Sequence, residues 1–199
     1  RIEGGAGDDY LDGGAGNDQV DGGEDDDVVR GGANDDVLRG GVGIDQVFGD
    51  AGADTLFGDA GRFDAAAAYA AVAGADTYTN LTGQRLFGGD GIDQVFGWSF
   101  STTPGDKARE SQLGGEEMHG GAGNDWLYGG IRRDVIYGDG GNDTVQGDGA
   151  IGPRYAANLP VISSGVTTYY GGADWISGGT GEDRLYGNAG DDTIFGGGD

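Results

Sequence analysis

Apolar residues recur at every ninth position over long stretches of the chain, and the residues between them are mostly small or polar. From Gly4 onward the eighth position of each nine is aliphatic: Leu11, Val20, Val29, Leu38, Val47 and Leu56. The residues on either side of it are polar or variable, which is the alternation of a strand with one buried face. Each nine therefore predicts one strand of roughly three residues at its end.

The first six positions of each nine predict a turn. Gly occupies the first, second and fourth positions in units such as GGAGDDYLD and GGAGNDQVD. Gly permits the positive φ and the close backbone approach that tight turns need. One unit cannot bury its single apolar side chain, whereas stacked units can. The pattern therefore predicts an all-β solenoid with two units per coil, two facing sheets and a thin apolar seam between them.

Three insertions interrupt this register within what we expect to be one solenoid domain. The expected divisions are regular repeats over 1–57, an insertion with one loose repeat over 58–86, a repeat over 87–96, an insertion over 97–119, repeats over 120–148, an insertion over 149–170 and repeats over 171–199. The Ala-rich stretch DAAAAYAAVAG in the first insertion favours a short helix. Both ends of the chain fall inside a repeat unit, so we expect a fragment of a longer chain.

Composition narrows the possible functions. The 199 residues include 48 Gly, 3 Pro and no Cys, and the formal net charge is −24. Collagen is excluded because no Gly-X-Y period is present, and a flexible linker because aliphatic residues recur regularly. The negative charge would repel phosphate, so we expect no nucleic-acid partner. Without Cys there is no disulfide framework, and no apolar run is long enough for a transmembrane segment.

Acidic residues recur at the sixth position of the units, which general solvation of the surface does not explain. These residues are Asp9, Asp18, Asp27, Asp36, Asp45, Asp54, Asp93, Asp125, Asp134, Asp143, Asp174, Asp183 and Asp192, with Asp76 in the loose repeat. Carboxylates and the carbonyls of Gly-rich turns are hard oxygen ligands, which suit calcium better than magnesium. Zinc is not favoured, because Cys is absent and His119 is the one His. His119 also lacks a nucleophile beside it, so no catalytic residue is predicted.

The units GGAGDDYLD, GGAGNDQVD and GGTGEDRLY resemble the nonapeptide GGxGxDxUx of the RTX (repeats-in-toxin) calcium-binding family. The resemblance covers most of the chain outside the insertions. It implies a right-handed parallel β-roll with two nonapeptides per coil and several calcium ions, each between turns one coil apart. It also implies a secreted bacterial protein that passes a type I secretion channel unfolded and folds on extracellular calcium.

The resemblance further implies which groups bind each ion. In the family, both turns contribute their sixth-position Asp, one turn adds carbonyls from positions two and four, and the next adds carbonyls from positions one and three. On this chain the implied carbonyl sets are Gly5 and Gly7 with Gly22 and Glu24, Gly14 and Gly16 with Gly31 and Ala33, Gly23 and Asp25 with Gly40 and Val42, Gly32 and Asn34 with Gly49 and Ala51, and Gly121 and Gly123 with Gly138 and Gly140. Asp25 and Asn34 depart from Gly, but both residue types tolerate the left-handed region.

The units beside two insertions depart further from the repeat. After Gly58 the acid is Asp64, one position late, and after Gly147 the sixth position is Gly152. We therefore expect half-sites there, each with a missing carboxylate and weaker or absent metal.

The unit GGIRRDVIY carries cations where other units have Gly and an acid or amide. Its sixth-position residue, Asp134, is expected to face Glu116 one coil earlier and the acid-free segment GDGAIG one coil later. We expect the Arg132 guanidinium to replace a missing calcium or to meet the adjacent acids, so that Arg132 and Arg133 mark a break in the calcium ladder.

Aromatic residues recur at the ninth position, which points away from the seam. They are Phe48, Phe57, Phe87, Phe96, Tyr128, Tyr137, Tyr186 and Phe195. Two interpretations remain open: the rings stack along the roll, or they form stripes that bind a partner chain or a glycan. The insertions likewise either dock against neighbouring copies or other domains of the same protein, or are tolerated surface loops.

Three interpretations of the function follow. The first is a calcium-binding RTX module of a secreted bacterial protein, extracellular or at the cell surface, that folds on binding calcium. The second is a rigid calcium-dependent segment of a surface-layer, filament or adhesin protein, with the insertions as assembly contacts. The third is the C-terminal secretion and folding module of an extracellular enzyme or toxin. In each case we expect this segment itself to have no enzymatic activity.

Overall fold

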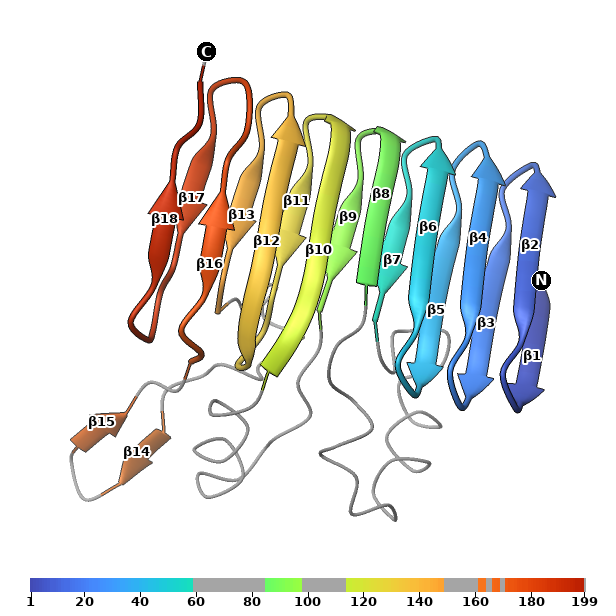
Figure 1. Cartoon of the computed structure of the whole chain (residues 1–199), viewed down its shortest axis with the longest axis horizontal. Coiled ribbons are helices and arrows are strands. Elements are labelled where there is room, and N and C mark those ends of the chain that lie inside the picture. The colour runs from blue at the N-terminus through green and yellow to red at the C-terminus, as the bar shows by residue number, and fades with distance from the viewer. Residues whose placement is uncertain (59–84, 98–113, 149–160, 164–165, 169–170, 199) are drawn as a thin grey trace.

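The computed structural model describes residues 1–58, 85–97, 114–148, 161–163, 166–168 and 171–198 (Figure 1). The described chain forms a parallel β-roll, as the repeat predicts. Successive strands alternate between two eight-stranded sheets, and neighbours within each sheet run parallel. Two nonapeptides therefore make one coil. No helix in the described part of the chain has the length and hydropathy to cross a bilayer.

The strands of the two sheets follow one another along the roll in chain order. The first sheet contains β1 (Ile2–Ala6), β3 (Gln19–Glu24), β5 (Val37–Val42), β7 (Thr55–Phe57), β9 (Gln94–Phe96), β11 (Trp126–Tyr128), β13 (Thr144–Gln146) and β17 (Arg184–Tyr186). The second contains β2 (Tyr10–Ala15), β4 (Val28–Ala33), β6 (Gln46–Ala51), β8 (Arg85–Gly91), β10 (Gly114–Gly123), β12 (Arg133–Gly140), β16 (Trp175–Ser177) and β18 (Thr193–Phe195). A separate antiparallel hairpin joins β14 (Val161–Ser163) to β15 (Val166–Thr168).

The apolar seam lies between the two sheets and consists of eighth-position side chains. Its fully buried members are Val20, Val29, Leu38, Val47, Leu56, Leu86, Val95, Met118, Leu127, Ile136, Val145 and Ile176. Each pairs in register with the equivalent residue one coil away, as Val20 does with Leu38. The core is therefore one side chain wide, and the turns on either side of it must be stabilised by other means.

The strands of the first coils are longer than the three residues predicted. β2 to β6 each contain six residues, because the Gly-Gly segment continues the ladder. Gly14 pairs with Gly32 although their φ values are 90° and 109°, a region that favours Gly. Identical backbone conformations one coil apart can stack even where they are not extended.

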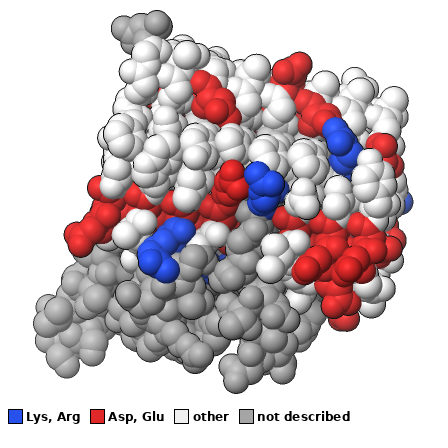
Figure 2. All heavy atoms as spheres, viewed as in Figure 1, with Lys and Arg blue, Asp and Glu red and all other residues white. Residues whose placement is uncertain are grey.

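The two edges of the roll differ. We call the turns that lead from the second sheet to the first the regular edge. Their sixth-position residues begin with Asp18 in the first coil and end with Asp183 in the last. The turns that lead from the first sheet to the second form the inserted edge. Their sixth-position residues begin with Asp9 and end with Asp192. All three insertions leave from the inserted edge, between β7 and β8, β9 and β10, and β13 and β16 (Figure 1). Figure 2 shows a band of Asp and Glu side chains following this edge.

Two predicted insertion boundaries are wrong. The roll resumes at Arg85 rather than after residue 86, and at Gly114 rather than after residue 119. The second error arises because EEMH lacks the repeat signature, yet Met118 fills the seam as well as Leu or Val does. The predicted helix in the Ala-rich stretch and the predicted ligand Asp76 lie outside the described residues.

Six of the eight ninth-position aromatic rings stack along the roll, which confirms that interpretation for Phe48, Phe57, Phe87, Phe96, Tyr128 and Tyr137. Ring centroids are 5.0 Å apart for Phe48 and Phe87, and 5.3 Å apart for Phe96 and Tyr128. His119 continues the ladder of the second sheet, 4.5 Å from the ring centroid of Tyr137. These contacts support the sheets from outside, where the seam supports them from within.

Candidate metal centre

Sixth-position carboxylates form a hydrogen-bonded ladder along each edge. One oxygen of each carboxylate accepts the backbone N–H of the sixth-position residue one coil earlier, as Asp45 Oδ1 does from Asp27 N at 2.9 Å. On the regular edge this ladder is unbroken through Asp18, Asp36, Asp54, Asp93, Asp125, Asp143 and Asp183. Insertions of different lengths therefore do not disturb the register of the regular edge.

The second oxygen of most of these carboxylates is buried. Among the described residues, Oδ2 is buried and has no hydrogen-bond partner in Asp27, Asp36, Asp45, Asp54, Asp93, Asp125, Asp143, Asp174 and Asp183. A buried carboxylate oxygen without a partner is costly unless a cation compensates it. The repetition of this cost from coil to coil after the first indicates a row of cation sites.

Backbone carbonyls converge on the same oxygens. A Cβ built on Gly120, at the first position of its unit, would lie 2.6 Å from Asp125 Oδ2 and 2.6 Å from the carbonyl oxygen of Gly138. The same arrangement recurs at Gly4, where Asp9 Oδ2 is 2.7 Å from the built Cβ. Carboxylate and carbonyl oxygens thus surround a space that a side chain would fill. This donor set consists of hard oxygens and fits calcium.

The five carbonyl sets implied by the resemblance to the family all lie on turns that stack directly over one another. Hydrogen bonds between the turns include Gly7 N to Glu24 O at 3.1 Å, and Asp25 N to Val42 O at 2.7 Å. Asp25 has a φ of 77° and Asn34 a φ of 81°, so both adopt the left-handed conformation expected of them. The structure therefore places the predicted carbonyls on neighbouring turns one coil apart.

Burial makes the ionised form of these carboxyls costly when no metal is bound. It raises the pKa of Asp45, Asp93 and Asp143 from an ordinary 3.8 to about 7. It raises the pKa of Asp27 and Asp54 to about 6, although backbone N–H donors oppose the shift. A bound divalent cation would favour the ionised form instead.

A buried cation, Arg132, lies on the described part of the inserted edge. The Arg132 guanidinium is fully enclosed at 1% exposure, and its Nη1 lies 3.0 Å from Glu116 Oε1, which is buried as well. Glu116 N donates to Asp134 Oδ1 at 2.8 Å, so Glu116 holds the sixth position of its coil as predicted. The expectation that Arg132 meets an adjacent acid is confirmed, and Arg133 is exposed beside it.

The expected half-site after Gly147 is wrong. We expected Gly152 at the sixth position and no acid opposite Asp134, but Asp134 N donates to Asp174 Oδ1 at 2.8 Å. Asp174 holds the sixth position because the insertion interrupts the turn after its second residue. The remaining positions are supplied from beyond the insertion. The other expected half-site, at Asp64, lies outside the described residues.

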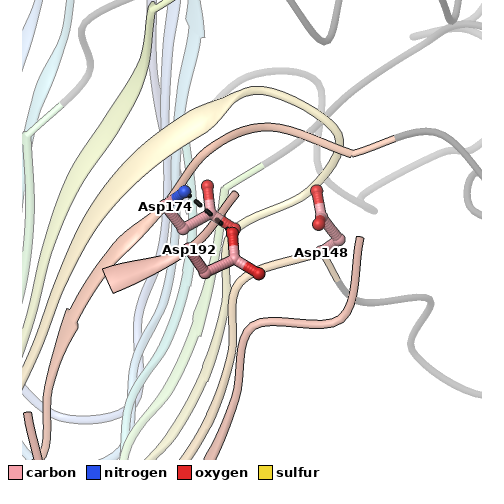
Figure 3. Close-up of side chains that lie close together, drawn as sticks. All are labelled: Asp148, Asp174 and Asp192. Atoms are coloured by element: carbon pink, nitrogen blue, oxygen red, sulfur yellow. Dashed lines mark hydrogen bonds between the residues drawn. The ribbon is translucent and has the colours of Figure 1, made fainter. Parts of the chain in front are cut away.

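One acidic residue near this break was not predicted as a ligand. Asp148 is 5% exposed and lies beside Asp174 and Asp192, each with one oxygen within 4.8 Å of the others (Figure 3). The repeat places Asp148 at the second position, where the family uses only the carbonyl. Residues 149–170 separate Asp148 from the rest of its turn in the sequence, so the nonapeptide pattern does not identify it as a ligand.

Comparison with protein families agrees with this geometry. The model of the RTX calcium-binding nonapeptide repeat matches four segments, residues 1–29, 30–62, 119–150 and 169–199. Together they cover more than half of the chain. The comparisons with curated proteins and with solved structures give no significant match.

Proposed function

The chain belongs to the RTX calcium-binding nonapeptide repeat family, and from this premise we propose that it is a module of a secreted bacterial protein that folds when it binds extracellular calcium. The observation that carries the proposal is the row of buried, unpartnered Oδ2 atoms facing backbone carbonyls. Calcium would be held by the sixth-position carboxylates and the carbonyls of the stacked turns, and would neutralise charge there.

The balance of forces explains why folding would depend on the metal. The seam contributes one aliphatic side chain per nonapeptide, while 48 Gly residues lose much conformational freedom on ordering. The net charge of −24 opposes compaction further. Because the site forms only when two turns stack, the free energy of binding becomes free energy of folding.

Calcium titration tests this proposal. Far-UV circular dichroism of the chain in chelator should show a disordered spectrum at pH 7.5, and millimolar calcium should produce a strand spectrum. Magnesium at the same concentration serves as the control, because it prefers a tight octahedral shell and keeps its water. A strand spectrum that persists in excess chelator would reject calcium-coupled folding.

Export through a type I channel follows from the same physics. A chain that stays unfolded at low cytosolic calcium could pass a narrow channel and fold outside the cell. The absence of Cys fits that route, since no disulfide has to form. We infer an extracellular or cell-surface location on this ground, with calcium as the folding signal.

A second candidate function is a rigid, calcium-dependent segment of a surface-layer, filament or adhesin protein. The departure of all three insertions from the inserted edge favours it, because contacts with neighbouring copies or domains would then gather on one side. Calcium-dependent assembly in light scattering, lost when the insertions are replaced by plain nonapeptides, would support this function.

The third candidate is the secretion and folding module of an extracellular enzyme or toxin. We infer that this segment is not itself the enzyme. His119, the one His in the chain, stacks between Phe87 and Tyr137 and contacts Asp139 at 2.9 Å. These contacts give it a place in the aromatic ladder. The sequence of the full-length gene would distinguish this candidate from the second.

A further inference from the structure

Three carboxylates meet where the third insertion interrupts the roll. Asp148, Asp174 and Asp192 point toward a common space (Figure 3). We propose that Asp148 is a third carboxylate ligand of a cation held between Asp174 and Asp192, in a site assembled from both sides of the insertion 149–170. The inference rests on the proposed calcium binding and adds a ligand that the repeat motif does not contain.

The turn that carries this site is complete in space although it is divided in sequence. Its first two residues precede the insertion: Gly147 N donates to Tyr186 O at 2.8 Å, and Asp148 N donates to Gly187 O at 3.2 Å. The turn ends after the insertion at Asp174, whose N donates to Asp192 Oδ1 at 3.0 Å. Residues 147–148 and 171–174 therefore take the six positions of one regular turn.

Asp148 differs from the two other acids that the structure describes at the second position. Asp50 and Asp139 have φ values of 72° and 71°, and their side chains turn outward to Arg30 and His119. Asp148 does not adopt this positive φ and is nearly buried. Where the chain leaves the roll, the Asp148 side chain therefore points inward, whereas those of Asp50 and Asp139 point outward.

The reversed carboxylate joins the two halves of the turn to the next coil. Asp148 Oδ1 accepts the N–H of Gly172 at 2.8 Å, and Oδ2 accepts the N–H of Ala189 at 2.9 Å. Asn188 Nδ2 also donates to the Asp148 carbonyl at 2.7 Å. Each carboxylate oxygen retains a lone pair after accepting one hydrogen bond, so both remain available to a cation.

An independent observation points to a ligand here. Asp174 is 2% exposed, and its Oδ2 is buried and has no hydrogen-bond partner. Two oxygens on opposite sides of a calcium ion, each at about 2.4 Å, are about 4.8 Å apart. The three carboxylates satisfy this limit. Among the described residues, no Lys or Arg forms an ion pair with them.

The third carboxylate has two consequences. Calcium affinity rises with the number of charged ligands, so this site should fill at lower calcium than sites with two carboxylates. The ion would also bind residues on both sides of the insertion, and so close its base.

Crystals of the chain grown at limiting calcium test the assignment directly. We expect an anomalous peak between Asp174 and Asp192 with an Asp148 oxygen within about 2.6 Å of it. An ion that leaves both Asp148 oxygens outside coordination distance would overturn the inference while leaving the proposed function intact. Absence of ions from every turn would overturn both.

Terbium binding provides the matched solution test. In a W98F/W126F background Trp175, which follows Asp174, is the remaining Trp and sensitises a lanthanide bound beside it. Asp148→Asn should raise the half-saturating terbium concentration about tenfold, because one charged ligand is lost. Asp139→Asn removes the same charge from an outward-facing second position and should change it less than twofold. Equal effects of the two variants would contradict the proposal.

Discussion

The first-position Gly is the residue on which each site depends most directly. At Gly120, the missing Cβ leaves room for Asp125 Oδ2 and the Gly138 carbonyl oxygen, which come within 2.6 Å of its place. At Gly196, in the last unit, nothing lies within 4 Å of the built Cβ. The same residue type is therefore essential in one unit and unconstrained in another, for a reason that lies in the neighbouring coil.

Gly120→Ala should disrupt the site between its turn and the turn beginning at Gly138. The methyl group would displace a carboxylate or carbonyl oxygen, so we expect the calcium-bound roll to lose about 2 kcal/mol or more. Gly196→Ala is the matched control and should stay within about 0.5 kcal/mol. Urea unfolding at fixed calcium measures both changes, and equal stability of the two variants would show that the space around Gly120 is not a site.

At the scale of elements, the two edges respond differently to interruption. The regular edge keeps its Asp ladder from Asp18 to Asp183 without a break. On the inserted edge, one interval contains the buried Arg132–Glu116 pair, and another contains the extra carboxylate of Asp148. In one interval a buried Arg side chain therefore takes the place of a bound cation. In the other, a third carboxylate is added to the cation site.

Arg132→Gly restores the repeat residue at the fourth position and should convert the internal cation into a calcium site. We expect one additional calcium ion bound per chain, because Glu116 and Asp134 then face each other without the guanidinium. At low calcium the variant should lose about 3–5 kcal/mol, since the buried Glu116 carboxylate loses its ion pair with Arg132. Calcium stoichiometry by equilibrium dialysis and urea unfolding measure the two effects.

Arg133→Gly is the control for this variant, because Arg133 is adjacent and exposed. It should leave the calcium stoichiometry equal to that of the parent chain. An Arg132→Gly chain that binds no further calcium, at any concentration that saturates the parent, would show that the guanidinium does not replace an ion.

The sequence predicts the elements wherever a nonapeptide is contiguous, and its errors have a common cause. The register of Val20, Leu38 and the other seam residues follows from a period that any unit reveals. Asp148 and Asp174 belong to one turn, but residues 149–170 separate them, and spacing along the chain is the only measure that a motif uses. The place of Met118 in the seam was not predicted. A seam position requires only an apolar side chain of suitable size, whereas the motif is recognised by its Gly and Asp residues.

At the scale of the whole molecule, the acidic edges make folding depend on protons as well as on calcium. In the folded chain without metal, the carboxyl groups of Asp45, Asp93 and Asp143 have pKa values of about 7, whereas the ordinary value of 3.8 applies in the unfolded chain. Between pH 4 and 7 the folded state therefore binds more protons than the unfolded state. Its stability falls as pH rises through this window, and is recovered as pH falls.

In the absence of calcium, lowering the pH from 8 to about 5 should therefore restore part of the strand spectrum, because protons neutralise the buried carboxyls that calcium would otherwise compensate. In the presence of calcium the direction reverses, and the calcium concentration at half-folding should rise as pH falls, since protons compete for the same oxygens. Circular dichroism over pH 4.5–8 measures both trends. A parallel series in 1 M salt screens the surface charge but not the buried sites. If 1 M salt restores the strand spectrum as strongly as acid does, the acid-induced folding would be due to net charge alone.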